Sequence, residues 1–284
     1  MKVIPFNVPK ISREAFRLQV DKVPYLYDKL HQHPETQIML IEKGEGTLIA
    51  GDYVGRFSEG DLFLIGGNRP HVFRNDASYY KSKSKLKAKA ISLYFDEKYA
   101  GESFWLLDEL QTAHQFLLTA GLGYRIEGLA RETITQIIRE LINKKGIEKL
   151  ILFFRLLQLL SEAKELIPLS VAPAQSNFSM GEGKRMNDIL QFTFSKSHRK
   201  IKIEEVAEVA HLSPEAFCRY FKTHTQKTYT NFLNEIRISN ACKMLIEKEK
   251  NIQEIGYEVG FSNLSHFNRT FKKVTGKTPK GYLP

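Results

Sequence analysis

The 284-residue sequence has little cysteine and no long apolar run. Its two cysteines, Cys218 and Cys242, lie in predicted helices without a Cys-x-x-Cys spacing, so we expect free thiols in a reducing cytosol. The most apolar stretch, residues 150–160, is broken by Arg155 and Gln158 and is too short to span a bilayer. The N-terminal residues contain prolines but no apolar run, so no signal peptide is expected. These absences predict a cytoplasmic protein with no membrane partner.

Charge is unevenly distributed along the chain. The net charge is +10, and residues 181–284 carry 18 Lys and Arg against 11 Asp and Glu, a net of +7. A basic last third suits a partner with a phosphate backbone, although a charge of this size also fits a merely soluble surface. The length predicts two domains, each with ample material for a core.

The last third of the sequence contains two copies of one segment. Three pairs of segments correspond: 203–210 (IEEVAEVA) with 252–261 (IQEIGYEVGF), 219–222 (RYFK) with 269–272 (RTFK), and 225–228 (TQKT) with 275–278 (TGKT). The offset is 49 residues from Ile203 to Ile252 and 50 from Arg219 to Arg269, so the second copy has one extra residue in its turn. A short helix, a tight turn and a second helix with a basic outer face form the helix-turn-helix pattern. Two such units predict a protein that binds two successive major grooves of double-stranded DNA.

The second helix of each unit is expected to face the DNA. In the first unit Ser213 is a good N-cap and precedes Pro214, and in the second unit Ser262 or Asn263 takes the cap position. The positions left on the outer surface are Glu215, Ala216, Cys218, Arg219 and Lys222 in the first unit, and Leu264, Ser265, His266, Asn268, Arg269, Lys272 and Lys273 in the second. Arg, Asn and Ser can read base edges, whereas Lys mostly meets phosphate. The alternative for each is an ordinary surface position of a helical bundle.

Residues 229–250, between the two units, predict one long helix. A helix of ~20 residues is ~30 Å long. This length is close to the ~34 Å of one DNA turn, so a single rod would hold both second helices at adjacent major grooves.

The order helix-turn-helix, long helix, helix-turn-helix resembles the AraC family of bacterial transcription regulators over about residues 184–284. Within residues 252–279 the resemblance is carried by Gly260-Phe261, His266-Phe267, Arg269, Phe271-Lys272 and Thr275-Gly276-Lys277-Thr278-Pro279. It implies a regulator of specific promoter DNA, with RNA polymerase as a further partner. Carried over by position, the contacts it implies are Glu215, Cys218 and Arg219, then Leu264, Ser265, His266, Asn268 and Arg269.

Two positions depart from the family pattern, both in the first unit. Glu215 is acidic at a reading position, where it would prefer a cytosine amino group or repel phosphate. Gln226 stands where the family usually has the glycine that ends this helix, whereas the second unit keeps Gly276. We therefore expect the second unit to recognise sequence more strongly, or the first to read a base with an unusual preference.

The first part of the chain predicts an antiparallel barrel or sandwich over residues 1 to about 100, because glycine-containing turns recur at close spacing. Residues 102–165 change to helical period and predict a hairpin of helices. Its wide apolar face fits either packing on the barrel or pairing in a homodimer. Residues 166–183 lose periodicity and form the predicted linker to the DNA-binding domain, residues 184–284.

Five lysines alternate strictly with other residues from Lys81 to Lys89. This spacing predicts an edge strand of the barrel with one solvated basic face. A secondary contact with DNA phosphate is the alternative function for this face.

Histidines mark the predicted barrel. His31 and His33 are two residues apart, so in a strand they share a face with Gln37, and His71 and Asn75 follow after a Gly-Asp turn. This order resembles the two cupin motifs over about residues 20–100. The resemblance implies an effector-sensing barrel whose mouth suits one small molecule, with His31, His33, Gln37 and His71 in its lining. By family analogy, a sugar or other polyol is the expected effector.

A divalent metal is the alternative ligand of this cluster. Metal-binding cupins hold the cation with three histidines and a glutamate, but Gln37, a neutral and poorer ligand, takes the place of the glutamate here. His31, His33 and His71 therefore either bind a metal or hydrogen-bond a small ligand or one another. No other cofactor is expected.

The sequence predicts a multidomain protein, with a mainly-β cupin-like barrel and helical hairpin over residues 1–165 and an all-α domain with two helix-turn-helix units. We expect a ligand-responsive transcription regulator and not an enzyme. One alternative is a cupin metalloenzyme, of isomerase or oxygenase type, with an accessory DNA-binding tail. Another is a regulator that only dimerises and senses nothing.

Overall fold

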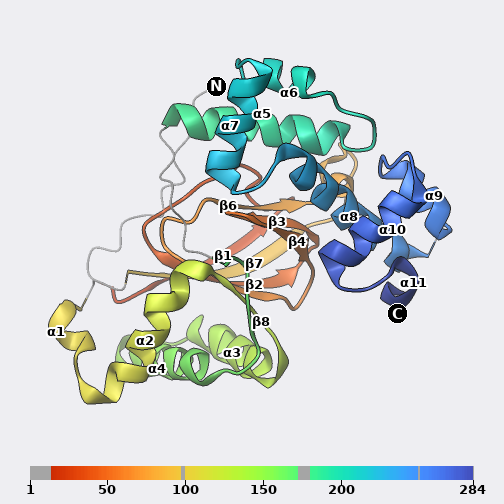
Figure 1. Cartoon of the computed structure of the whole chain (residues 1–284). Helices are drawn as coiled ribbons and strands as arrows, with labels where there is room; N and C mark the ends of the chain where they lie inside the picture. The colour runs from red at the N-terminus through yellow and green to blue at the C-terminus, as the bar shows by residue number, and fades with distance from the viewer. Residues whose placement is uncertain (1–13, 97–99, 172–179, 249, 284) are drawn as a thin grey trace. The chain divides into compact units, whose positions relative to one another are not determined.

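The N-terminal barrel is built from two sheets that face each other (Figure 1). The computed structural model describes residues 14–96, 100–171, 180–248 and 250–283. The larger sheet has the strand order β1-β7-β2-β5-β8-β9, with antiparallel neighbours throughout, and the smaller sheet has the order β4-β3-β6. The strands are β1 (Arg17–Val23), β2 (Thr36–Lys43), β3 (Gly46–Ala50), β4 (Tyr53–Phe57), β5 (Leu62–Ile65), β6 (His71–Asn75), β7 (Ala88–Phe95), β8 (Tyr124–Ile126) and β9 (Leu166–Pro168). The expected mainly-β first domain is confirmed.

The unbroken apolar run of β2 follows from burial on both faces of the strand. Ile38 and Leu40 pack into a core shared with helices, whereas Met39 and Ile41 point into the barrel. Side chains alternate along a strand, so the two sets belong to different cores. The larger sheet therefore separates a helix-covered core from the interior of the barrel.

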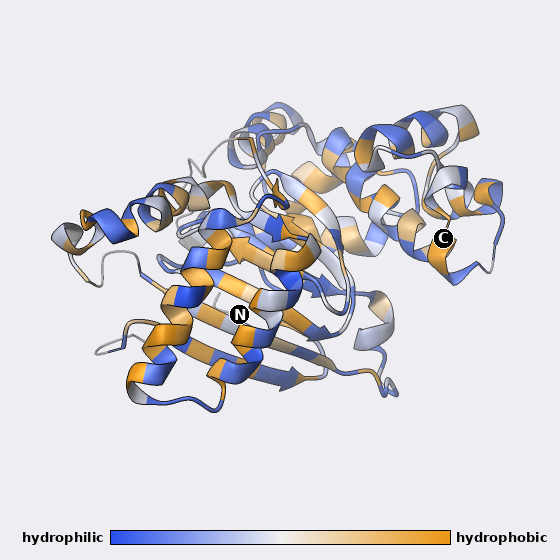
Figure 2. Cartoon of the chain, turned by 90° about the horizontal axis from the view of Figure 1, so that it is seen from below, coloured by the Kyte–Doolittle hydropathy of each residue, from blue (hydrophilic) through white to orange (hydrophobic). Residues whose placement is uncertain are grey.

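Helices cover the outer face of the larger sheet, and α3 (Gly128–Leu141) and α4 (Gly146–Glu162) form the predicted hairpin (Figure 1). The shorter helices α1 (Glu102–Trp105) and α2 (Gln111–Thr119) precede it. In Figure 2, hydrophobic and hydrophilic positions alternate along these helices, as expected where one face is buried. Ile147 and Ile151 of α4 remain 68% and 59% exposed, so the barrel covers only part of its apolar surface.

Three local features differ from the sequence prediction. The three-residue strand β8 lies between α2 and α3, and residues 166–168 of the predicted linker form β9. Residues 81–87 form a loop, so of the alternating lysines only Lys89 lies in a strand, where it pairs with Glu42 at 3.1 Å. The residues between the other lysines are mostly exposed and offer no continuous apolar face to a sheet, so charge alternation alone was a poor strand signal.

The C-terminal part is helical and contains two helix-turn-helix units. Its helices are α5 (Met180–Lys196), α6 (Ile203–Val209), α7 (Pro214–Thr225), α8 (Tyr229–Glu247), α9 (Ile252–Glu258), α10 (Leu264–Thr275) and α11 (Pro279–Tyr282). Helices α6 and α7 form the first unit, and α9 and α10 form the second. Four residues separate α6 from α7 and five separate α9 from α10, which confirms the extra residue in the second turn.

Phenylalanine pairs fix the second helix of each unit. Phe217 and Phe221 of α7 are fully buried, as are Phe267 and Phe271 of α10, and the ring centroids within each pair are 5.7 Å apart. Both pairs pack near α8, Phe221 against the ring of Phe232 at 5.3 Å and the α10 pair in the core that α8 shares with α9. The 19-residue helix α8 is thus common to both units, as predicted, although it ends three residues earlier than expected.

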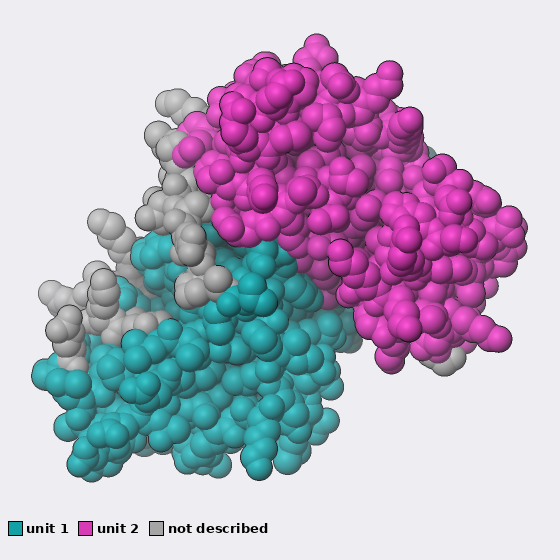
Figure 3. Space-filling model, in the orientation of Figure 1, with its two compact units in different colours: residues 1–53, 57–177 teal, residues 54–56, 178–284 magenta. Residues whose placement is uncertain are grey.

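The chain divides into two compact units (Figure 3), residues 1–53 with 57–177 and residues 54–56 with 178–284. Helix α5 begins at Met180, inside the predicted linker of residues 166–183. Residues 172–179 of that linker lie outside the described residues. None of the described helices is both long and apolar enough to cross a membrane.

Candidate functional site

Helix α7 presents most of its predicted contact residues to solvent. The Ser213 side chain accepts a hydrogen bond from the Ala216 backbone N–H at 3.3 Å, which caps the helix as expected. Ala216 is half-buried, and the exposed members of the predicted set are Glu215, Cys218, Arg219 and Lys222. Both cysteines of the chain are free thiols, and burial on α8 raises the pKa of Cys242 to about 11.

Helix α10 presents a richer polar surface. Asn263 rather than Ser262 is the cap, because its side chain accepts from the His266 backbone N–H at 2.9 Å. The exposed members of the predicted set are Ser265, His266, Asn268, Arg269, Lys272 and Lys273, and Leu264 is half-buried. The His266 ring packs edge-on against Phe261, with centroids 5.3 Å apart, so this imidazole has a defined place at the start of the helix.

The arginines of the two units divide into outer and inner ones. Among the described residues, Arg219 and Arg269 form no ion pair, so their guanidinium groups are free for an outside partner. Arg237, in contrast, is buried and donates to two backbone carbonyls, one of them that of Ser197 at 2.8 Å. Arg199 forms an ion pair with Glu205 at 2.6 Å. The outer arginines therefore have no visible structural role.

The second helices of the two units end differently. Gln226 closes α7 in the left-handed region with φ 57°, and Gly276 closes α10 with φ 75°. This conformation costs a residue with a side chain about 1–2 kcal/mol, whereas glycine adopts it without that cost. The absence of the expected glycine after α7 thus changes the strain of the cap but not its geometry.

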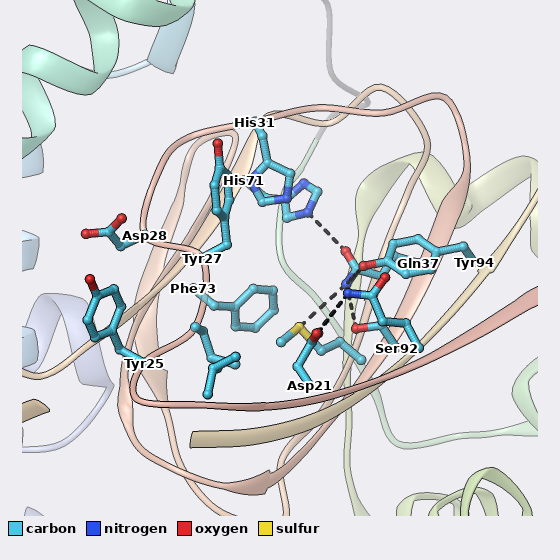
Figure 4. Close-up of a pocket in the computed structure, with 14 residues that line it drawn as sticks. Asp21, Tyr25, Tyr27, Asp28, His31, Gln37, His71, Phe73, Ser92 and Tyr94 are labelled. Carbon is cyan, nitrogen blue, oxygen red and sulfur yellow. Dashed lines mark hydrogen bonds between the residues drawn. The ribbon is translucent and has the colours of Figure 1, made fainter. Parts of the chain in front are cut away.

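A cavity of about 390 Å³ opens in the barrel between β1, β2, β6, β7 and the segment before His31 (Figure 4). The residues that line it are Gln19, Asp21, Val23, Tyr25, Leu26, Tyr27, Asp28, His31, Gln37, Met39, His71, Phe73, Ser92 and Tyr94. Three of the four predicted residues, His31, Gln37 and His71, belong to this lining. His33 does not, and its ring lies beside those of His71 and Tyr94, with centroids 5.1 and 5.3 Å away.

The three histidines converge although they do not share a strand. His31 and His71 form an isolated antiparallel bridge, and His33 lies outside any strand, so the predicted common strand face was wrong. Each Nδ1 lies 2.8–2.9 Å from a backbone carbonyl two residues away. A carbonyl only accepts, so each Nδ1 carries the proton and each Nε2 keeps its lone pair. Burial lowers the pKa of His31 to about 4 and also lowers those of His33 and His71, so all three are neutral at neutral pH.

Gln37 connects the cluster to β7. Its amide lies 3.0 Å from His71 Nε2, and 3.0 and 3.2 Å from the hydroxyls of Ser92 and Tyr94. Figure 4 draws Gln37 with Oε1 toward His71 Nε2 and with Nε2 toward both hydroxyls. Because neutral His71 accepts at Nε2, we assign the amide the other way round, so that its N–H donates to His71 and its carbonyl accepts from both hydroxyls. This orientation satisfies every group in the network. Gln37 is therefore held in place on all sides.

The cluster could supply three of the four protein ligands that a cupin metal site uses, but it lacks the fourth, a carboxylate. His31, His33 and His71 each offer a ring nitrogen, and these atoms lie within 4.8 Å of one another. The backbone bonds at Nδ1 are the outer contacts that orient metal-binding histidines. The remaining position holds the neutral amide of Gln37, so the set brings no negative charge to a divalent cation.

The sequence prediction missed most of the cavity wall. Gln19, Asp21 and Val23 alternate on β1 and all face the cavity, and Tyr94 and Ser92 reach it from β7 (Figure 4). The alternation within residues 17–23 was the available signal. It looks the same on any half-buried strand, so it could not mark these residues as a binding site.

Known proteins match both parts of the chain. Residues 206–284 match a helix-turn-helix domain model and residues 24–79 a cupin domain model. The uncharacterized HTH-type transcriptional regulator YdeC of Bacillus subtilis is 25% identical over 258 residues, covering 90% of this chain and 86% of the relative. YobQ, of the same description and organism, is 31% identical over 93 residues, covering 33% of this chain and 39% of the relative. An uncharacterized HTH-type transcriptional regulator of Staphylococcus aureus is 24% identical over 247 residues, covering 86% of this chain but 31% of the relative.

A solved structure, the C-terminal domain of AraT, a response regulator from Geobacillus stearothermophilus, is 27% identical. It covers 38% of this chain and 86% of that chain, with a TM-score of 0.33. The chain spans most of the first relative, YdeC, but well under half the length of the other two relatives named above.

Two helix-turn-helix units are typical of DNA-binding proteins. The cupin-like barrel that precedes them makes this chain one of the DNA-binding proteins that have a separate N-terminal domain. The domain matches and the relatives, all of them transcriptional regulators, place the chain within this class. It is an AraC-type transcription regulator with a cupin-like N-terminal domain.

Proposed function

We propose that α7 and α10 enter two adjacent major grooves of promoter DNA. The observation that carries this proposal is the sharing of α8 between the two units. Its 19 residues give a rod of about 28 Å, close to the ~34 Å of one helical turn of DNA. A rigid spacer of this length favours both helices meeting one face of the duplex.

The exposed side chains support different roles for the two helices. On α10, Ser265, Asn268 and Arg269 can bond base edges, and the lysines of its last turn can bond phosphate. On α7, Arg219 is accompanied by the acidic Glu215. We therefore propose that α10 makes the stronger sequence readout.

The barrel cavity is the proposed site of a small effector. Its volume suits one small molecule, and polar groups converge on an otherwise apolar wall. A sugar or other polyol is the effector that the family analogy suggests. Bound effector changes DNA occupancy only if it favours one arrangement of the two units over another. On this proposal the protein is a cytoplasmic regulator and not an enzyme.

A second copy of the chain and RNA polymerase are further proposed partners. The exposed Ile147 and Ile151 on α4 support pairing through the helical hairpin, because a monomer gains nothing from leaving them in water.

The two-groove proposal predicts a footprint with a specific period. On a selected binding site, hydroxyl-radical cleavage by the full-length protein should show two protected windows on one face of the duplex, about one turn (~10 base pairs) apart per bound chain. The same DNA with the protein at high salt is the control, since phosphate contacts weaken with salt. One continuous window shorter than a helical turn would contradict insertion of both helices.

A divalent cation in the histidine cluster is the second candidate ligand, and the substitution Gln37→Glu tests it. Because Gln37 brings no charge, we expect the purified wild-type protein to carry less than stoichiometric Fe, Mn, Ni or Zn. Gln37→Glu buries a carboxylate and should lower the unfolding temperature in a chelator, then recover it when Mn²⁺ or Ni²⁺ is added. Elemental analysis and thermal unfolding of both proteins check this. Stoichiometric metal in the wild type would favour the metalloenzyme alternative.

A further inference from the structure

The barrel cavity carries an unbalanced negative charge. Its lining includes two carboxylates, Asp21 and Asp28, but neither lysine nor arginine. Asp28 has a cationic partner outside the lining, Arg74, at 3.6 Å. Among the described residues, Asp21 has none, because its oxygens accept only from the Gln19 amide at 2.9 and 3.1 Å.

The two histidines in the lining do not neutralise this charge. Their Nδ1 atoms face backbone carbonyls, at 2.9 Å in His31 and 2.8 Å in His71, and His71 Nε2 lies 3.0 Å from Gln37. A ligand that enters the cavity therefore meets one uncompensated carboxylate.

The remaining wall suits a cation as well. Aromatic rings of Tyr25, Tyr27, Phe73 and Tyr94 line the cavity, and aromatic faces attract positive charge within about 6 Å of the ring centre. Figure 4 shows Asp21 with Phe73 on one side and Gln37, Ser92 and Tyr94 on the other, while Tyr25 lies farther away beside Asp28. A neutral or anionic ligand would cover the carboxylate without balancing its charge, which is costly.

We infer that the effector is an organic cation, either an amine or a quaternary ammonium compound, and that Asp21 on β1 recognises its charged nitrogen. This inference rests on the proposed effector function of the barrel and names the chemical class of the ligand. Gln19 holds the carboxylate in place, and the Ser92 and Tyr94 hydroxyls, which donate to Gln37, keep lone pairs that can accept from polar groups on the rest of the ligand. A sugar fits this site best when it carries an amino group.

Matched probes test the charge of the ligand on the full-length protein. Glucosamine, glucose and glucuronate share one ring and differ in charge, and choline is compared with its neutral analogue in which a tert-butyl group replaces the trimethylammonium. Calorimetric titration should show glucosamine and choline binding about ten- to a hundredfold more tightly than their neutral counterparts, as a charge-assisted bond would produce. Tighter or equal binding of glucose or glucuronate would overturn the cation inference while leaving an effector barrel, and so the proposed function, in place.

The substitution Asp21→Asn tests the residue. It keeps the size of the side chain and should lower the affinity for the two cations about ten- to a hundredfold while leaving the neutral probes unchanged. Asp108→Asn, an exposed position outside the cavity, is the matched control and should change nothing. Unchanged cation affinity in Asp21→Asn, or no binding of either cation to the wild type, would overturn the inference. The DNA footprint of the same preparations shows independently whether the protein is folded and whether the DNA-binding proposal stands.

Discussion

Replacing Arg269 by alanine is expected to weaken binding to a selected DNA site by about ten- to a hundredfold. Arg269 is exposed on the outer face of α10. Among the described residues it has no ion-pair partner, so it makes no such contribution to the stability of the fold. Two buried rings, Phe267 and Phe271, anchor the helix from the opposite face. Removal of the guanidinium group should therefore leave the fold intact and remove only contacts with DNA.

The size and specificity of this loss distinguish base readout from simple charge attraction. Fluorescence anisotropy with the selected site and with random DNA should show a larger loss for Arg269→Ala on the selected site. Arg155→Ala on α4 removes the same charge from the barrel unit and should change neither affinity. Equal affinity of Arg269→Ala and wild type for both DNAs would remove α10 as a reading helix.

The equivalent change in the first unit should have a smaller effect. Arg219 occupies the matching face of α7, but its surroundings are Glu215 and Cys218 rather than a serine, a histidine and an asparagine. A carboxylate near the phosphate backbone opposes binding, so the net contribution of this helix is reduced. A greater loss for Arg219→Ala than for Arg269→Ala would instead indicate that the first unit dominates through an unusual base preference.

The sequence predicted the helical domain well because its signals are local. The repeat from Ile203 and from Ile252, and the caps at Ser213 and Asn263, each depend on residues within a few positions of one another. The resulting helices, inward phenylalanines and turn lengths all agree with the structure. Here local propensity and burial indicate the same elements, so one sequence is enough.

The barrel was harder to predict because its pairings are distant in sequence. Strands β8 and β9 have three residues each, and they join the sheet because β8 pairs with β5 and β9 pairs with β8. Likewise, Asp21 and His71 come from elements 50 residues apart, and nothing near either residue indicates a common cavity. The histidines were found from a motif, but the carboxylate that sets the charge of the cavity was not.

Gly260, in the turn of the second unit, should tolerate no side chain. Its φ is 100°, and a Cβ built there would lie 2.5 Å from the carbonyl oxygen of Ser197. That carbonyl cannot move aside easily, because buried Arg237 donates to it at 2.8 Å. Strained backbone and overpacking together should lower the free energy of unfolding of the helical unit by about 2–5 kcal/mol in Gly260→Ala.

Gly276→Ala is the matched control for this loss. Gly276 also has a positive φ, 75°, but a Cβ there would meet no atom within 4 Å, so only the backbone strain of about 1–2 kcal/mol should appear. Denaturant unfolding followed by far-UV circular dichroism reports the helices of both units, whereas the fluorescence of Trp105, the single tryptophan, reports the N-terminal unit alone. A transition that is seen only in the dichroism therefore belongs to the helical unit. Equal losses for the two alanine variants would show that the carbonyl of Ser197 yields to the new methyl group. A much larger loss at Gly260 would mean that the contact between this turn and the segment after α5 holds the turn in place before α10, the helix that we propose makes the stronger readout.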